Sequence, residues 1–334
     1  MYYSEPEQLI EEIQKAEYCG DLFEQDEKKI RQKYREYAKL IHPDLCKADG
    51  APQAFAKLNY LYARALDRLG KGGWEESNVL RLEDLSPMKY LWTEPFELGR
   101  WYVSDDRMVY EFDEDKLKYR HNYENARMLI QYADSRMANL FRKKTGVVEL
   151  YCKKAIIVGK DIHDYPLGRF MEVMKGHLSG RDIAWMVSRL MDLCCFLRYS
   201  RLVLNGFCES NLLINPMEHS IMIAGGWWYA VPEGAPMTGT NRTVLEQMLT
   251  SVRTSKIASY TTDIECVKGL ARKLIACAHD VPKELVSWAE SGSSDNAITE
   301  YGRWNAALEK AYGQRRFEKM ADIHDRIYAG GGTI

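Results

Sequence analysis

The chain lacks several features that would assign a protein to a class directly. Its net charge is only −2 over 334 residues, which argues against wholesale binding of nucleic acid or of acidic membranes. The longest apolar stretch, Leu190–Leu197, contains Asp192 and is too short to cross a bilayer. The first residues, MYYSEPEQLIEEIQKAE, are acidic and have a helical pattern rather than that of a secretory leader. We therefore expect a cytoplasmic protein with neither nucleic acid nor membrane as a partner.

Signatures of metal and redox chemistry are also missing. The 8 cysteines are scattered, with no CxxC pair and no histidine at zinc-finger spacing. The adjacent Cys194 and Cys195 lie in an apolar run, as buried thiols of a reducing compartment do. No arrangement of Ser, His and Asp or of Cys and His is recognisable from residue order. The sequence thus predicts no metal site and no cofactor.

Composition divides the chain into a small helical part and a larger mixed part. A glycine-rich break follows residue 69, as in a linker. Runs such as RMVYEF and GVVELYCKKAIIV predict strands, helical spacing predicts a helix over 123–144, and most of the chain after 181 has helical patterns. The predicted fold class is α+β: an all-α domain (1–69), a linker (70–85), a strand-rich then helical domain (86–330) and a tail (331–334).

Two amphipathic helices are predicted on either side of a short polar loop in the first domain. Asp26 is a suitable N-cap for the first of them, which must end before Pro43 because the residue preceding a proline leaves the helical region. Its apolar stripe is Ile30, Tyr34, Tyr37, Ala38 and Ile41. A second stripe runs from Phe55 to Leu69, so the two helices should bury these faces against each other as an antiparallel pair.

A basic helix face and the tripeptide that follows it form the first candidate site. The basic residues are Lys28, Arg31, Arg35 and Lys39. Such a cluster should attract an acidic surface in a salt-sensitive manner. His42, Pro43 and Asp44 come directly after it. Either feature alone is more often a solvated face or a capped turn than a binding site.

Together these features resemble the J domain of DnaJ-type co-chaperones. YREYAKLIHPD is followed by AFAKLNYLYARAL, whereas AEYCGDLF matches the first-helix signature of that family poorly. The residues that match its third-helix pattern are Ala54, Phe55, Leu58, Asn59 and Tyr62. The resemblance implies docking on a DnaK-type chaperone and stimulation of its ATP hydrolysis. The basic residues would steer the encounter, and His42 and Asp44 would make the coupling contacts.

The segment after residue 181 resembles the catalytic segment of protein-kinase-like folds. A long amphipathic helix leads into RLVLNGFCESNLLINPMEHSIMIAGG, in which NLLI and SIMI should form two strands around a turn at Asn215 and Pro216. The resemblance implies a bilobal domain with a strand-rich N-lobe and a helical C-lobe. Asp164–Gly168 would form the hinge between the lobes, and Asp263 would hold the catalytic loop.

The groups that phosphoryl transfer needs are replaced in this segment. The resemblance puts Leu204, Asn205 and Gly206 at the catalytic His-Arg-Asp, Cys208 at the lysine that follows, and Gly225 or Gly226 at the metal-binding aspartate. Asn211, normally a magnesium ligand, remains. Glu111 stands where the phosphate-binding lysine would lie, and its charge would repel phosphate. The second domain is therefore predicted to be pseudokinase-like, with no catalytic residues.

Three functions follow from these patterns. The first is a co-chaperone whose kinase-like domain binds a client or another partner protein. The second is a pseudokinase scaffold or adaptor, and the third is an atypical ATP-dependent phosphotransferase. A different α+β fold with coincidental motifs also stays open, as does the role of Trp227 and Trp228, which could form a ligand platform or a buried turn.

Overall fold

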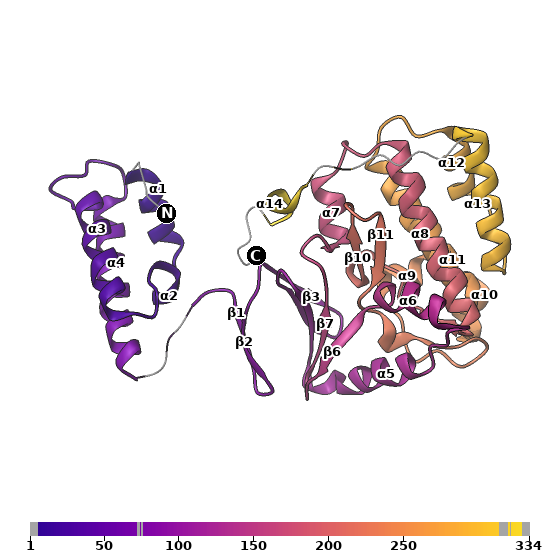
Figure 1. The fold of residues 1–334 in the computed structure, drawn as a ribbon, viewed down its shortest axis with the longest axis horizontal. Coiled ribbons are helices and arrows are strands. Elements are labelled where there is room, and N and C mark those ends of the chain that lie inside the picture. The colour runs from indigo at the N-terminus through magenta and orange to yellow at the C-terminus, as the bar shows by residue number, and fades with distance from the viewer. Residues whose placement is uncertain (1–5, 72–73, 75, 314–319, 321, 329–334) are drawn as a thin grey trace. The chain divides into compact units, whose positions relative to one another are not determined.

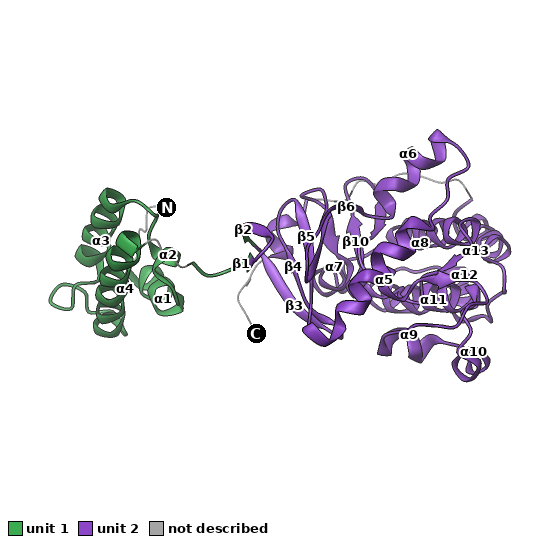
Figure 2. Ribbon diagram, turned by 90° about the horizontal axis from the view of Figure 1, so that it is seen from below, with its two compact units in different colours: residues 1–81, 87–89 green, residues 82–86, 90–334 purple. Residues whose placement is uncertain are grey.

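The computed structural model describes residues 6–71, 74, 76–313, 320 and 322–328. The chain forms two compact units, residues 1–81 with 87–89 and residues 82–86 with 90–334 (Figures 1 and 2). The tail expected at 331–334 lies outside the described residues. Over the described part of the chain, no helix has both the length and the apolar character needed to cross a membrane.

The first unit is built on a helical hairpin. Its helices are α1 (Pro6–Lys15), α2 (Cys19–Leu22), α3 (Glu27–Ile41) and α4 (Ala51–Lys71). Asp26 caps α3 as predicted, because its carboxylate accepts the backbone N–H of Lys29 at 3.0 Å. Helices α3 and α4 are antiparallel, since Tyr34 contacts Tyr62 while His42 contacts Phe55. The two predicted stripes share one core with α1, which confirms the predicted pairing of helices.

The segment predicted as a linker, 70–85, is partly ordered secondary structure. Helix α4 continues to Lys71, and β1 (Val79–Leu82) pairs with β2 (Leu85–Lys89) in a two-stranded sheet. Ser77 is tied to Asp21, whose carboxylate accepts the serine backbone N–H at 2.5 Å and the hydroxyl at 2.6 Å. These bonds fix Ser77, within the predicted linker, to a residue 56 positions earlier in the chain.

The strand-rich part of the second unit is an antiparallel five-stranded sheet (Figure 2). Its strands, in spatial order, are β3 (Trp92–Phe96), β4 (Gly99–Val103), β5 (Arg107–Phe112), β7 (Ala155–Gly159) and β6 (Val147–Tyr151). Strand β5 is the predicted strand RMVYEF, and it lies at the centre of the sheet with most of its residues buried. The predicted strands in GVVELYCKKAIIV are β6 and β7.

The single helix predicted over 123–144 is wrong in its extent. After the short 3-10 helix η1 (Glu114–Lys116), the chain forms α5 (Leu117–Met128) and α6 (Ser135–Lys144), separated by residues 129–134. Asp134 caps α6 by accepting the backbone N–H of Met137 at 2.7 Å. The apolar spacing continues across the break, so periodicity alone could not show that a new helix begins there.

The second part of this unit is mainly helical (Figure 1). Its elements are β8 (Tyr165–Pro166), α7 (Leu167–Val173), α8 (Gly180–Tyr199), β9 (Leu202–Val203), η2 (Glu209–Asn211), β10 (Leu212–Asn215), β11 (Ser220–Ile223), η3 (Trp227–Tyr229), β12 (Val231–Pro232), α9 (Arg242–Gln247), α10 (Thr250–Ser255), α11 (Tyr260–Ala276), α12 (Lys283–Glu290), α13 (Ala297–Tyr312) and α14 (His324–Ile327). Helix α8 packs against α11 and α13.

The predicted hairpin of NLLI and SIMI is confirmed, and most of the segment predicted as the hinge, Asp164–Gly168, forms secondary structure. Strands β10 and β11 are antiparallel, with Leu212 opposite Ile223. The last buried strand of the sheet ends at Gly159, and residues 160–164 lead to the helical part. Residues 165–168, expected in the hinge, instead belong to β8 and α7, because Tyr165 and Pro166 pair with β10.

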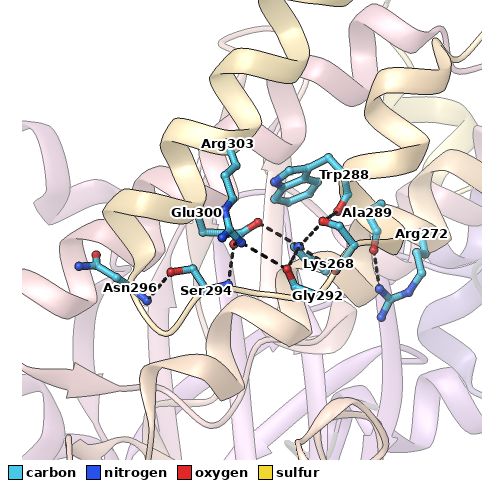
Figure 3. Close-up of polar contacts among 10 residues, drawn as sticks. Lys268, Arg272, Trp288, Ala289, Gly292, Ser294, Asn296, Glu300 and Arg303 are labelled. Carbon is cyan, nitrogen blue, oxygen red and sulfur yellow. Dashed lines mark hydrogen bonds and ion pairs between the residues drawn. The ribbon is translucent and has the colours of Figure 1, made fainter.

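A fully buried ion pair joins α11 and α13 (Figure 3). The Nζ atom of Lys268 lies 2.9 Å from Oε1 of Glu300, and neither side chain is exposed. Lys268 also donates to the carbonyl and hydroxyl oxygens of Ser291, at 3.0 and 3.1 Å. The second oxygen of Glu300 accepts the backbone N–H of Ser294 at 2.7 Å and lies 3.3 Å from Arg303. These partners compensate the burial of both charges, so the cluster is part of the helical frame.

Candidate functional sites

The first candidate site is the turn between α3 and α4. The carbonyl of His42 accepts the backbone N–H groups of Leu45 and Cys46, both at 2.8 Å. Its ring meets that of Phe55 edge-on, with 5.1 Å between centroids, and its Nδ1 accepts the backbone N–H of Asp44 at 3.3 Å. The side chain of His42 is still 42% exposed, and that of Asp44 is 87% exposed. Packing therefore fixes the turn while its polar groups face solvent.

The four basic residues predicted for this site are all exposed along α3. They are Lys28, Arg31, Arg35 and Lys39. Arg31 pairs with Glu27 at 2.8 Å. The other three form no ion pair with another residue in the described part of the chain. Positive charge is thus left uncompensated on the helix that leads into the His-Pro-Asp turn.

Polar residues of α4 lock the two helices together below this surface. The hydroxyl of Tyr34 donates to Oδ1 of Asn59 at 2.7 Å. The ring of Tyr34 stacks on that of Tyr62, with 4.0 Å between centroids and 19° between planes. Asn59 and Tyr62 therefore hold the hairpin in register rather than facing solvent as binding groups.

The second candidate site is the loop that follows β9. Asp263, in the first turn of α11, accepts the backbone N–H of Leu204 at 2.7 Å and that of Asn205 at 3.0 Å. This is the role that the kinase-like resemblance implies for it. Burial raises the pKa of Asp263 to about 7, although the two backbone hydrogen bonds act in the opposite direction. The loop is thus held through its backbone, independently of the side chains it carries.

Gly206 and Gly225, which the resemblance puts at two aspartate positions, leave no room for a larger side chain. A Cβ added to Gly206 would lie 2.9 Å from the Cα of Gly226. One added to Gly225 would lie 2.6 Å from Oδ1 of Asn211, 2.7 Å from the hydroxyl of Tyr110 and 2.8 Å from the ring of Trp228. The volume that a catalytic or metal-binding carboxylate would need is therefore filled by neighbouring atoms.

Asn211 and Cys208 are buried and bonded within the same loop. The amide of Asn211 donates to the carbonyl of Gly206 at 2.9 Å and to Sγ of Cys208 at 3.2 Å. The amide of Asn241 donates to the same sulfur at 3.0 Å. Burial raises the pKa of Cys208 to about 11. Asn211, which the resemblance puts at a magnesium ligand, therefore holds the loop here through its amide group.

Trp227 and Trp228 are fully buried, as expected of a turn with aromatic packing rather than an open ligand platform. The ring centroid of Trp228 lies 5.1–5.9 Å from those of four other aromatic residues, Phe96, Tyr110, Phe112 and Tyr123. The next residue, Tyr229, donates its hydroxyl to Glu97 at 3.0 Å. Aromatic side chains thus fill the space beside the β3–β4 hairpin.

Glu111 lies on β5, where the resemblance would put a phosphate-binding lysine. It is opposite Arg100 of β4 in the sheet register. Its Oε2 accepts the hydroxyl of Tyr102 at 2.9 Å. Burial and this hydrogen bond to a carboxylate both raise the pKa of Tyr102. The position therefore carries negative charge in a hydrogen bond within the sheet.

A groove of about 590 Å³ lies elsewhere in the second unit, between α8 and α13. The ring of Trp185 stacks on that of His219 at its wall, with 4.4 Å between centroids and 4° between planes. None of the residues lining the groove belongs to either candidate site. Within the described ranges, no three side chains of His, Cys, Asp or Glu gather as a metal site would require.

The thiols differ in their surroundings. All 8 cysteines are free. Burial raises the pKa of the thiols of Cys194, Cys195, Cys208, Cys266 and Cys277, among others. In the first unit Cys19 is buried, whereas Cys46 is partly exposed next to the His-Pro-Asp turn.

Comparisons with known proteins assign no family to the chain. No family model matches it, and no curated protein does. Among solved structures, it is similar to vaccinia related kinase 3, with a TM-score of 0.47 and 12% identity over 70% of this chain and 91% of that one. The order of elements seen here, a five-stranded sheet, α8, the β10–β11 hairpin and α11 with Asp263 bonded to the loop, is the order that the sequence motifs predict. The second unit is an α+β fold with a strand-rich part and a helical part.

Proposed function

We propose that this chain is an adaptor. Its kinase-like unit binds a partner protein without transferring phosphate, and its first unit links that partner to a DnaK-type chaperone. The observation that carries the first half is the closed space around Gly206 and Gly225, where an added Cβ meets other atoms at less than 3.0 Å.

The chemistry of phosphoryl transfer supports this proposal. The reaction needs a carboxylate near the acceptor hydroxyl, a cation on the phosphates and a carboxylate that holds the metal ion. The kinase-like resemblance puts glycine at both carboxylate positions and Glu111 at that of the cation. No single substitution would restore these groups, because the side chains around the glycines would also have to move.

A titration with ATP and magnesium tests this half. Binding to the folded state raises the free energy of unfolding by about 2.7 kcal/mol when ligand is at 100 times its Kd. We expect no rise in the melting temperature of the full chain and no transfer of labelled phosphate to a generic acceptor protein. A rise of several degrees together with phosphate transfer would overturn the proposal in favour of an atypical phosphotransferase.

The second half of the proposal, co-chaperone activity, is supported by the His-Pro-Asp turn. His42 is held against Phe55 with much of its side chain exposed, and Asp44 extends into solvent. Three cations of α3 precede them, and none of the three pairs with an acidic residue among those that the structure describes. An acidic surface on the chaperone would attract this helix, and the histidine and aspartate would then make directed hydrogen bonds.

The ATPase rate of a DnaK-type chaperone, measured with the full chain, tests this second half. We expect stimulation by the wild type, loss of stimulation with His42→Gln, and a lower rate with Arg35→Glu that depends less on salt. Lys15→Glu is the matched control, because Lys15 is 75% exposed on α1 and lies outside the proposed contact. No stimulation by the intact chain, or equal stimulation by His42→Gln, would refute co-chaperone activity and leave the adaptor role of the second unit standing.

A further inference from the structure

Helix α14 is attached to the helical part of the second unit and lies beside α7 (Figure 1). We call residues 322–328, which contain this helix, the α14 segment. Its two isoleucines, Ile323 and Ile327, are buried in the core of the unit. Arg169 of α7 donates its Nε–H to the carbonyl of Ile327 at 2.9 Å, and Arg326 donates to a carbonyl of α7 at 3.2 Å. Apolar burial and hydrogen bonds to the backbone thus fix one side of the segment.

The α14 segment also contacts the strand-rich part and the connection between the two parts. Nε2 of His324 lies 3.7 Å from Oδ1 of Asp105, which belongs to the turn between β4 and β5. Oδ1 of Asp322 lies 3.8 Å from Nδ1 of His163 in the connection, and it accepts the hydroxyl of Tyr165 at 3.4 Å. One short segment therefore joins both parts of the unit.

Both of these bridges pair a histidine with an aspartate. A neutral imidazole gains little from a carboxylate at nearly 4 Å, whereas an imidazolium forms an ion pair with it. Histidine takes up its proton between about pH 8 and pH 5. Asp322 stays ionised over this range, because the backbone N–H of His324 donates to its carboxylate at 3.0 Å and lowers its pKa. The strength of the two bridges therefore follows the charge of the two imidazoles.

Carboxylates are concentrated at the junction of the α14 segment, the β4–β5 turn and the connection. Asp161 accepts the backbone N–H of His163 at 3.0 Å. The other acidic residues are Asp105 and Asp106 of the turn, Asp164 of the connection, and Asp322 and Asp325 of the α14 segment. Negative charge near an imidazole favours its protonated form.

Lys160 brings a positive charge to the same junction. Its ammonium group donates to the backbone carbonyls of Asp105 and Asp161, both at 2.9 Å. Burial lowers the pKa of Lys160 to about 8, although the neighbouring aspartates act in the opposite direction. Burial also raises the pKa of Tyr165 and Tyr328, whose rings contact each other at the junction, so these hydroxyls stay neutral. The aspartates of the junction therefore outnumber Lys160.

The guanidinium groups on neighbouring elements are compensated by glutamates. Arg107 of β5 lies closer to Glu149, at 2.8 Å, than to Asp106, at 3.8 Å. Arg169 of α7 pairs with Glu172 at 2.9 Å. The charge around the two histidines is therefore negative, and it favours the uptake of protons by both.

We propose that the α14 segment is a pH-sensitive clamp between the strand-rich and helical parts of the second unit, tightened by protonation of His163 and His324. With both imidazoles charged, each forms an ion pair with an aspartate of another element, and the segment is held on both sides. As pH rises these ion pairs are lost, whereas the contacts of Ile323 and Ile327 do not titrate and keep the segment on the helical part. One link between the two parts is then weakened. This regulation goes beyond the adaptor function and does not depend on it.

Hydrogen exchange of the full chain, followed by mass spectrometry of peptides that contain the α14 segment, tests the proposal. The amides of Ile327 and Tyr328 are suitable reporters, because they donate to the carbonyls of Ile323 and His324 at 2.9 and 3.3 Å. Their observed exchange rates are divided by the intrinsic rates at each pH to obtain an opening constant. In the wild type this constant should fall about threefold or more between about pH 7.5 and pH 5.5.

Two variants assign the effect to the bridges. Asp105→Asn should stay close to the wild type at about pH 7.5 and lose about half of the change at lower pH, because it removes a carboxylate but no apolar contact. The double variant His163→Gln with His324→Gln should change less than about 1.5-fold over the same range. His279→Gln is the matched control, since His279 lies 3.9 Å from its neighbour Asp280 and bridges no elements, and it should keep the wild-type dependence.

The opposite results would overturn the clamp. An opening constant that does not change with pH in the wild type would leave the α14 segment as a permanent attachment. A full wild-type dependence in both Asp105→Asn and the double histidine variant would assign it to Lys160 or to another group. If the double variant were unprotected at every pH, Asp105→Asn alone would decide, because its side chain is mostly exposed and its loss should not disturb the fold.

Discussion

The His-Pro-Asp turn and the loop that follows β9 are held in similar ways. They differ in the side chains that they expose to solvent. In the turn, Phe55 supports the ring of His42 from below, and Asp44 extends into solvent. In the loop, Asp263 holds the backbone through two hydrogen bonds, but Gly206 and Gly225 offer no side chain. Backbone atoms of Gly226 lie against Gly206, and side chains including those of Tyr110 and Trp228 lie against Gly225. The contacts that hold a loop in place are therefore separable from the reactive side chains that the loop carries. In the second unit the loop after β9 is held by hydrogen bonds to its backbone, and neighbouring atoms fill the space beside its glycines.

The largest effect on stability should come from adding a carboxylate side chain at Gly225. We expect Gly225→Asp to lower the free energy of unfolding of the second unit by more than about 4 kcal/mol, because it adds both a steric clash and a buried, unpaired carboxylate. Urea unfolding of the full chain, followed by tryptophan fluorescence, measures it. Gly302→Ala is the control, since a Cβ there meets nothing within 4 Å. If Gly225→Asp were stable and bound magnesium, the space would be a usable metal site and the comparison would fail.

A smaller loss is expected from the ion pair that lies away from the loop. Glu300→Gln leaves the ammonium group of Lys268 buried without a counter-charge, so the free energy of unfolding should fall by about 3 kcal/mol. The double variant Lys268→Met with Glu300→Leu should recover most of this loss, because it removes both charges. Guanidinium unfolding of the wild type, the single variant and the double variant measures both changes in the free energy of unfolding. Equal instability of the single and double variants would mean that the hydrogen bonds to Ser291 and Ser294 matter more than the charges.

The pH dependence of stability tests how the loop frame is held. The pKa of Asp263 is raised from 3.8 to about 7 in the folded state, so between these values the folded chain binds more protons than the unfolded one. The contribution of this group to stability is therefore complete below its unfolded pKa and is lost as pH rises to about 7, at up to about 1.4 kcal/mol per pH unit. Asp263→Asn should remove that slope from a series of urea titrations. An unchanged slope in the variant would assign the dependence to other groups.

The smallest effect on stability should come from the exposed aspartate of the His-Pro-Asp turn. Asp44→Ala should change the free energy of unfolding by less than about 0.5 kcal/mol, because the side chain is 87% exposed and its backbone N–H still reaches His42. Tyr34→Phe, in the frame below, should cost about 1 kcal/mol through the lost bond to Asn59. Thermal unfolding compares the two, and chaperone stimulation should follow the opposite order. If Asp44→Ala unfolded the hairpin, Asp44 would be one of the residues that hold the turn in place.

Local signals in the sequence were sufficient for much of the fold. Asp26 as a cap, the stripes of α3 and α4, and the strands on either side of Asn215 all depend on neighbours within a few residues, and all are confirmed. The break between α5 and α6 was missed because its signal, the cap at Asp134, lies inside an uninterrupted apolar pattern. Strand β8 was missed because it is defined by its pairing with a distant strand.

The candidate sites show the same difference between signals from neighbouring residues and contacts between distant ones. The motif residues His42 and Asp263 could be found from their sequence neighbours. The packing of Trp228 against Phe96 and the pairing of Lys268 with Glu300 could not, because each joins residues 32 or more positions apart. A glycine in a sequence also does not show whether the space beside it is empty or filled. The space beside Gly225 is filled, because Asn211, Tyr110 and Trp228 together lie against it.

The distribution of thiols has a practical consequence for following this chain in solution. A maleimide reacts with thiolate, and burial raises the pKa of the thiols in the second unit, so at neutral pH they react slowly. Cys46 is partly exposed, and its backbone N–H is bonded to His42 at 2.8 Å. An environment-sensitive dye should therefore attach at Cys46 without any engineered cysteine. Its emission would report directly when another molecule covers the His-Pro-Asp turn.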